Sequence, residues 1–101
     1  MISEIDIYHQ LGKRITYLRK KKGLSSLQLA INADINKNYL NDLENGRRNP
    51  SLMILRKVAI ALDIDLSELF IGIRDYSLSN DYNKIKQLYR LDYNLLLLYY
   101  T

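Results

Sequence analysis

Hydrophobic residues in the first part of the chain recur at the spacing of an amphipathic helix. Four of them follow one another at intervals of four, four and three residues and share one stripe: Ile7, Leu11, Ile15 and Leu18. We expect a first helix that begins near residue 3 or 6 and runs to about residue 22. Gly23 follows it, and glycine is the residue that most often ends a helix.

Two short helices are predicted between residues 25 and 46. Ser25 and Gln28 have the S-x-x-Q spacing of a capping box, which marks the start of the first helix. Its small residue Ala30 allows a second helix to cross closely. The pattern breaks at Asp34, where we expect a sharp turn with positive φ, a conformation that Asp tolerates better than most residues.

The second short helix has a cap at each end. Asn36 can cap its start. Tyr39, Leu40 and Leu43 give it an apolar side at intervals of three to four residues. Gly46 stands just past its end, where a left-handed conformation is wanted.

Two further helices are predicted before the chain changes character. Ser51 can cap a fourth helix over residues 52–62, whose core-facing positions are Leu52, Leu55, Val58, Ala59 and Leu62. The D-x-x-E spacing of Asp65 and Glu68 indicates a capping box that opens a short fifth helix. Its expected packing residues are Leu66, Leu69 and Phe70.

The remaining residues form a linker and one more helix. We expect a domain over residues 1–72, a linker over residues 73–80 and a leucine-rich helix over residues 81–101. This apolar helix must be buried, either against its own domain, against another protein, or against the same helix of a second subunit, the reading we favour. The dimerisation residues would be Ile85, Leu88, Leu91, Leu95, Leu98 and Tyr99. The fold class is therefore all-α.

Composition argues against several classes of function. The chain has no cysteine and one histidine, His9, so we expect no metal site, no cofactor and no cysteine nucleophile. No nucleophile–base set, paired carboxylates or glycine-rich phosphate loop is visible, which argues against an enzyme. The start of the chain is not that of a signal peptide, and no apolar run reaches the ~20 residues that span a membrane. We expect a cytoplasmic protein.

Positive charge is concentrated in the middle of the chain. Between Lys13 and Lys57, basic residues outnumber acidic ones eleven to three, whereas acidic residues gather on both sides of this stretch. We interpret this distribution as one electropositive face, which would suit binding to a polyanion. An ordinary solvated surface is the alternative, and it is preferred for Lys20, Lys21 and Lys22 taken alone.

Several segments together resemble the helix-turn-helix domain of the phage repressor and Cro family, also called the xenobiotic-response-element family. Beside residues 25–46 they are LGKRITYLRKKKGLS, LENGRRNPS and ALDIDLSELF. The resemblance implies a five-helix repressor-like domain whose third helix reads the major groove of double-stranded DNA. It also implies that Arg19 pairs with Glu44, although Arg19 could contact phosphate instead. Asp34 and Ser26 depart from the family, which usually has glycine and glutamine there.

The resemblance also assigns the DNA contacts. The base-reading positions would be Lys37, Asn38, Asn41 and Asp42, residue types that pair with guanine, adenine and cytosine edges. Asp42 could instead be solvated, or repel phosphates. The phosphate-binding positions would be Ser25, Ser26, Gln28, Tyr39, Asn45, Arg47, Arg48 and Asn49.

These inferences favour a sequence-specific transcriptional regulator, a dimeric repressor that reads a near-palindromic operator. In such dimers the two recognition helices lie about 34 Å apart. The alternative is a protein-interaction module of the antitoxin or anti-repressor type, in which the C-terminal helix binds a regulatory partner protein. The polar, basic surface around Lys37 discriminates between them, because a pure scaffold does not need it.

Overall fold

The computed structural model describes residues 4–74, which form four α-helices and one 3-10 helix. The elements are α1 (Glu4–Lys21), α2 (Ser26–Ala33), α3 (Lys37–Glu44), α4 (Leu52–Ala61) and η1 (Leu66–Phe70). The described part of the chain is all-α, as predicted. The predicted short fifth helix is present, and its residues wind as a 3-10 helix. The predicted C-terminal helix and its dimerisation residues lie outside the described residues.

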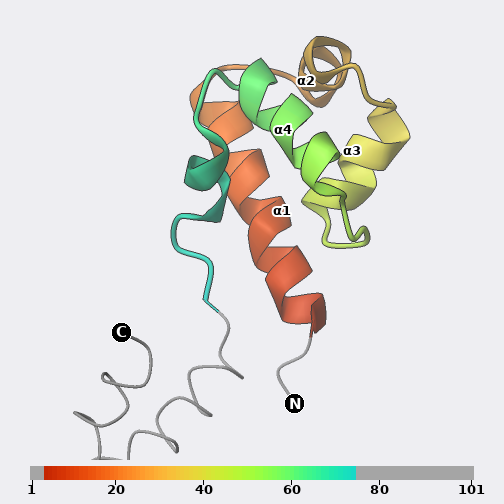
Figure 1. Cartoon of the computed structure of the whole chain (residues 1–101). Helices are drawn as coiled ribbons and strands as arrows, with labels where there is room; N and C mark the ends of the chain where they lie inside the picture. The colour runs from red at the N-terminus through yellow and green to blue at the C-terminus, as the bar shows by residue number, and fades with distance from the viewer. Residues whose placement is uncertain (1–3, 75–101) are drawn as a thin grey trace, which may run out of the picture.

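The helices pack around α1, the longest element. Figure 1 shows α2, α3 and α4 grouped to one side of α1 and the 3-10 helix on the other. α1 packs against α3 and η1, α2 packs against α3 and α4, and α4 packs against η1. Segments that are far apart in the sequence thereby enclose a single core.

Every element contributes to that core. Its buried residues are Leu11, Ile15, Leu29, Ala30, Leu40, Leu43, Leu55, Val58, Ala59, Leu62 and Leu69. The predicted stripe of the first helix is buried at Leu11 and Ile15, and Leu18 packs partly buried against the same cluster. Tyr39 and Ile35 also lie at its edge. The helix-turn-helix segment therefore rests on an apolar base.

Two predicted core residues are exposed. Leu52 is 65% exposed because it is the first residue of α4 and lies beyond the part of the helix that its neighbours cover. Phe70 is 44% exposed because η1 is a 3-10 helix. In that geometry residues three apart eclipse one another, so Leu66 and Leu69 share the core side and Phe70 turns away from it.

All four α-helices end in a left-handed residue. Gly23 and Gly46 have φ values of 75° and 74°, as expected for helix-ending glycines. Asp34 has φ 54°, which confirms the sharp turn predicted there, and Asp63 plays the same part after α4 with φ 55°. The sequence did not single out Asp63, which completes a motif that reverses the chain toward η1.

Gly12 allows α1 to approach α3 closely. A Cβ atom added at Gly12 would lie 2.6 Å from the carbonyl oxygen of Leu43, and closer still to that of Glu44. The two helices can come this close only because residue 12 has no side chain. This explains a glycine in the middle of a helix, where glycine otherwise weakens the structure. The contact brings the C-terminal end of α3 directly onto α1.

Candidate nucleic-acid interface

α3 presents one buried side and one polar side. Leu40 and Leu43 point into the core with 0% and 1% exposure. Lys37, Asn38 and Asn41 are exposed on the other side of the helix. Three of the four candidate base-reading residues therefore share the outward surface of a single helix.

The start of α3 is fixed by its cap. The side-chain oxygen of Asn36 accepts hydrogen bonds from the backbone amides of Asn38, at 2.7 Å, and Tyr39, at 3.3 Å. This satisfies two amides that otherwise have no partner within the helix. The first turn, which carries Lys37 and Asn38, is thereby held in helical form.

The end of α3 is fixed by an ion pair with α1. The structure brings Arg19 and Glu44 together through two hydrogen bonds, Nε to Oε2 at 2.7 Å and Nη2 to Oε1 at 3.0 Å. Arg19 also donates from Nη1 to the carbonyl oxygen of Leu24 at 3.0 Å. The two side chains are only 11% and 8% exposed, so Arg19 serves as a link between helices and is too buried to serve as a phosphate contact.

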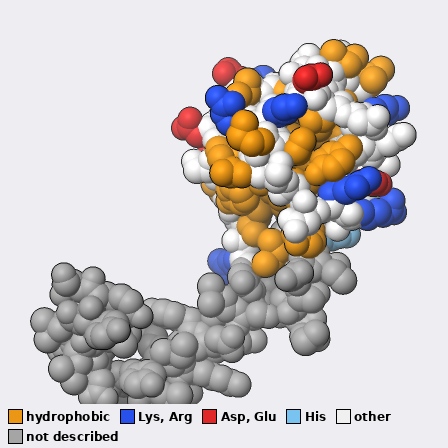
Figure 2. All heavy atoms as spheres, turned by 45° about the vertical axis from the view of Figure 1, so that its right-hand side comes forward, with side chains coloured by type: hydrophobic (Ala, Val, Ile, Leu, Met, Phe, Trp, Pro, Cys, Tyr) orange, Lys and Arg blue, Asp and Glu red, His pale blue; other side chains and the backbone are white. Residues whose placement is uncertain are grey.

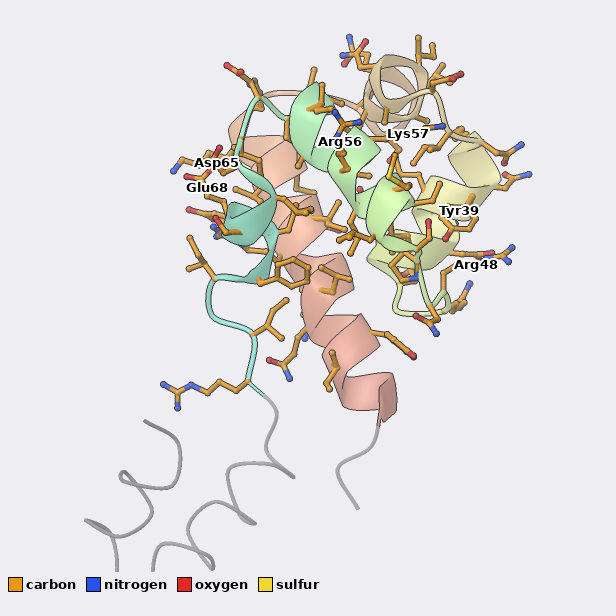
Figure 3. The ribbon with its side chains drawn as sticks, in the orientation of Figure 1. Tyr39, Arg48, Arg56, Lys57, Asp65 and Glu68 are labelled. Carbon is orange, nitrogen blue, oxygen red and sulfur yellow. The ribbon has the colours of Figure 1, made fainter. Side chains whose placement is uncertain are left out.

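Beyond α3 the chain turns back along the helix. Past Gly46, the amide of Arg47 donates to the carbonyl oxygen of Asp42 at 2.9 Å. Arg48 Nη2 lies 3.4 Å from Asp42 Oδ2, and Arg47 Nη1 lies 3.9 Å from Asp42 Oδ1. The Arg48 guanidinium also lies over the Tyr39 ring, 5.0 Å from its centre, and Figure 3 shows the two side chains next to each other.

The phosphate-binding candidates fall into two groups. Asn45, Arg47, Arg48 and Asn49 are exposed in the loop between α3 and α4. In this loop the Asn45 side chain donates to the carbonyl oxygen of Asn41 at 2.7 Å. Tyr39 is half-buried beside Arg48.

The second group stands at the start of α2. The Ser25 hydroxyl accepts from the Gln28 amide at 3.1 Å, and the Gln28 side-chain oxygen accepts from the Ser25 amide at 2.8 Å. The predicted capping box is confirmed, and both side chains are engaged in it. Ser26 is the first residue of α2 and is half-buried.

Acidic residues lie near η1, on the side of the domain away from Arg48. Figure 3 shows Asp65, which precedes η1, and Glu68 of η1 at one side, Arg48 at the other, and Arg56 and Lys57 on α4 between them. On the face turned forward in Figure 2, several Lys and Arg side chains lie at the right-hand edge and others at the upper left, with hydrophobic side chains across the middle. The arginines of the loop after α3 therefore place positive charge beside the outward side of α3, where it would attract a polyanion.

The association of Asp42 with the two arginines was not predicted. Asp42 and Arg48 are six residues apart, which is not a helical contact spacing. They meet because Gly46, in a left-handed conformation, reverses the chain. The turn predicted at Gly46 was therefore the sequence signal that could have indicated this contact. Among residues 4–74 no group of acidic, histidine or cysteine side chains could hold a metal ion, and no helix has the length and apolar character to cross a membrane.

Known proteins share this sequence pattern. The model of a helix-turn-helix family matches residues 15–69, more than half of the chain. The HTH-type transcriptional regulator SlrR of Bacillus subtilis (strain 168) is 43% identical over 61 residues, which are 59% of this chain and 40% of SlrR. The chain thus spans less than half the length of that relative. The control protein C.MunI of Mycoplasma sp is 42% identical over 69 residues, 67% of this chain and 93% of C.MunI.

A solved structure shares the fold as well. The restriction-modification controller protein C.AhdI from Aeromonas hydrophila superimposes with a TM-score of 0.62 at 41% sequence identity. The superposition covers 62% of this chain and 96% of that one. With its capped α3, its turn and its matching family model, the chain belongs to the helix-turn-helix family of phage-repressor and Cro type, a family of DNA-binding transcriptional regulators.

Proposed function

We propose that this protein is a sequence-specific repressor that binds a near-palindromic operator as a homodimer. The single observation that carries the proposal is the outward side of α3, where Lys37, Asn38 and Asn41 are exposed on a helix fixed at both ends. The names of the relatives, a transcriptional regulator and a control protein, support the same class of activity.

We assign base reading to those three residues. Lysine can donate to guanine O6 and N7, and asparagine can pair bidentately with adenine. The fourth candidate, Asp42, has both carboxylate oxygens within 4 Å of arginine nitrogens, Oδ1 at 3.9 Å and Oδ2 at 3.4 Å. It is therefore less available to accept from cytosine.

Phosphate contacts would come from the loop after α3 and from the start of α2. Arg47, Arg48, Asn45 and Asn49 follow the recognition helix closely enough to meet the same backbone, and the first amides of α2 supply a further anion site. If about five phosphates are neutralised, log K should fall with log salt at a slope of about −4 to −5. These contacts position the protein and carry no sequence information.

The dimer would form through the leucine-rich helix of residues 81–101, which lies outside the described residues. This part of the proposal rests on sequence alone: leucines at intervals of three and four from Leu88 to Leu98. Sedimentation of the full chain should give a dimer, and Leu91→Lys with Leu95→Lys should give a folded monomer. A dimer that survives both substitutions would place the contact elsewhere.

The test of the function is a selection of genomic DNA fragments by the purified full chain, read by sequencing. The variant Lys37→Ala/Asn38→Ala is run beside it. We expect an enriched near-palindrome that the variant no longer selects. Equal retention of all fragments by both proteins would refute sequence reading through these residues.

A matched control separates base reading from charge. Lys20→Ala removes the same single positive charge from an exposed position on α1 and leaves α3 intact. It should select the same near-palindrome as the natural chain. If the near-palindrome is lost with this variant as well, the effect belongs to net charge. If the natural chain retains no DNA and captures a protein through residues 81–101, the interaction-module alternative holds.

A further inference from the structure

Asp42 is an acidic residue placed among the proposed DNA contacts. Its side chain is 31% exposed, against 68% for Arg47 and 49% for Arg48, and it extends from the second turn of α3 toward these two arginines. Arg48 is held twice, by the carboxylate at 3.4 Å and by the Tyr39 ring at 5.0 Å. The free protein therefore already offers its loop arginines an anion.

This anion resembles the one that DNA supplies. Carboxylate and phosphate oxygens are both accepted by the guanidinium fork, so a DNA phosphate and the Asp42 side chain compete for the same donors. A phosphate that approaches Arg48 is also repelled by the remaining carboxylate charge. Both effects act on every DNA sequence alike, because every sequence presents the same backbone.

We propose that Asp42 acts as an intramolecular competitor for phosphate. It weakens binding to DNA in general, so that stable binding requires the base contacts of Lys37, Asn38 and Asn41. The inference rests on the proposed function and names the residue that sets how much base contact stable binding requires. It differs from base reading by Asp42, which would strengthen binding to one sequence only.

The contacts between Asp42 and the two arginines are weak enough for a DNA phosphate to displace the carboxylate. The Arg47 contact is long and exposed, and exposed ion pairs of this kind contribute little and break readily. Arg48 stays close when the ion pair breaks, because its planar guanidinium rests on Tyr39. A DNA phosphate can thus replace the carboxylate while the Arg48 side chain stays in place.

The test is Asp42→Asn, which keeps the shape of the side chain and removes its charge. Binding is measured to a duplex carrying the selected operator and to a scrambled duplex of the same length, at one salt concentration. We expect the affinity for the scrambled duplex to rise about five- to tenfold, the effect of removing one unit charge near a phosphate. The affinity for the operator should rise by the same factor, because the operator presents the same backbone, so the ratio of the two affinities stays unchanged.

Two controls make the result specific. Asp63→Asn changes the net charge equally at a side chain that is 95% exposed and beyond α4, and Asn also tolerates its positive φ. It should leave both affinities unchanged within about twofold. In an Arg48→Gln background the gain from Asp42→Asn should shrink to about twofold, since the competitor has lost its main target.

Three results would overturn the proposal. A loss of operator affinity alone makes Asp42 a base reader, and no change at either duplex makes it a solvated residue. A full gain that persists with Arg48→Gln leaves only direct repulsion of phosphate. If the natural chain prefers no sequence, the proposed function fails separately, while the scrambled duplex still tests the competition. Thermal unfolding of each variant shows that it is folded.

Discussion

The ion pair between Arg19 and Glu44 should be the most sensitive polar contact in the domain. We consider Glu44→Gln, which preserves volume and removes the charge. Arg19 would then keep its charge at a side chain that is 11% exposed, where it still donates to the carbonyl oxygen of Leu24. Breaking a buried pair by removing one partner costs about 3–5 kcal/mol, because the other charge is left uncompensated.

That loss is large for a domain of this size. At about 0.05–0.15 kcal/mol per residue, the described part of the chain has a free energy of unfolding on the order of 4–10 kcal/mol. Urea unfolding followed by circular dichroism measures the change, and with a slope of about 1 kcal/mol per molar the midpoint should fall by about 3–5 M. A variant with Arg19→Met and Glu44→Leu should recover much of the loss, since apolar replacement of both partners is often neutral.

The matched control is an exposed acid-to-amide change. Asp63 lies 3.9 Å from Lys22 and its side chain is 95% exposed, so Asp63→Asn should change stability by about 0.5 kcal/mol or less. If Glu44→Gln is no more destabilising than Asp63→Asn, the pair does not lock α1 to α3. If the double replacement costs as much as Glu44→Gln, the loss does not come from an uncompensated charge.

Three backbone and capping changes give further predictions, all measured by urea unfolding. Gly12→Ala should cost about 2–3 kcal/mol, because the added methyl meets the carbonyl oxygen of Leu43 at 2.6 Å; a gain, as helix propensity alone requires, would contradict the close crossing. Ser25→Ala should cost about 1 kcal/mol through loss of the cap, and an unchanged midpoint would assign no weight to the capping box. Asp34→Gly should stabilise by about 0.5–1 kcal/mol, since glycine relieves φ 54°; destabilisation would mean that the aspartate side chain is needed at the turn.

Features that depend on neighbouring residues could be predicted from the sequence. The capping box of Ser25 and Gln28, the cap at Asn36 and the left-handed turn at Asp34 all form within a few residues. Side-chain to backbone contacts of this kind are decided locally, so residue type and spacing suffice. The helix bounds followed, because caps and helix-ending residues fix where each helix begins and ends.

Features that depend on distant elements could not be predicted from the pattern. Leu52 fits the apolar stripe of α4, but its exposure depends on how far the neighbouring helices reach. The exposure of Phe70 depends on whether a five-residue segment winds as a 3-10 or an α-helix. Gly12 gave no signal either, because its role appears only when α3 crosses α1.

The residues that hold α3 in place also form a separate set from those that would select the DNA sequence. α3 is fixed by Asn36 at its start and by the contact of Glu44 with Arg19 at its end. Lys37, Asn38 and Asn41 lie between these anchors and are exposed, and surface substitutions away from caps and buried pairs barely change stability. The residues that hold the helix are therefore distinct from those that we propose read the bases. Operator preference can change on this fold without a change in the fold itself, which is why the shape of the domain identifies its family but not its operator.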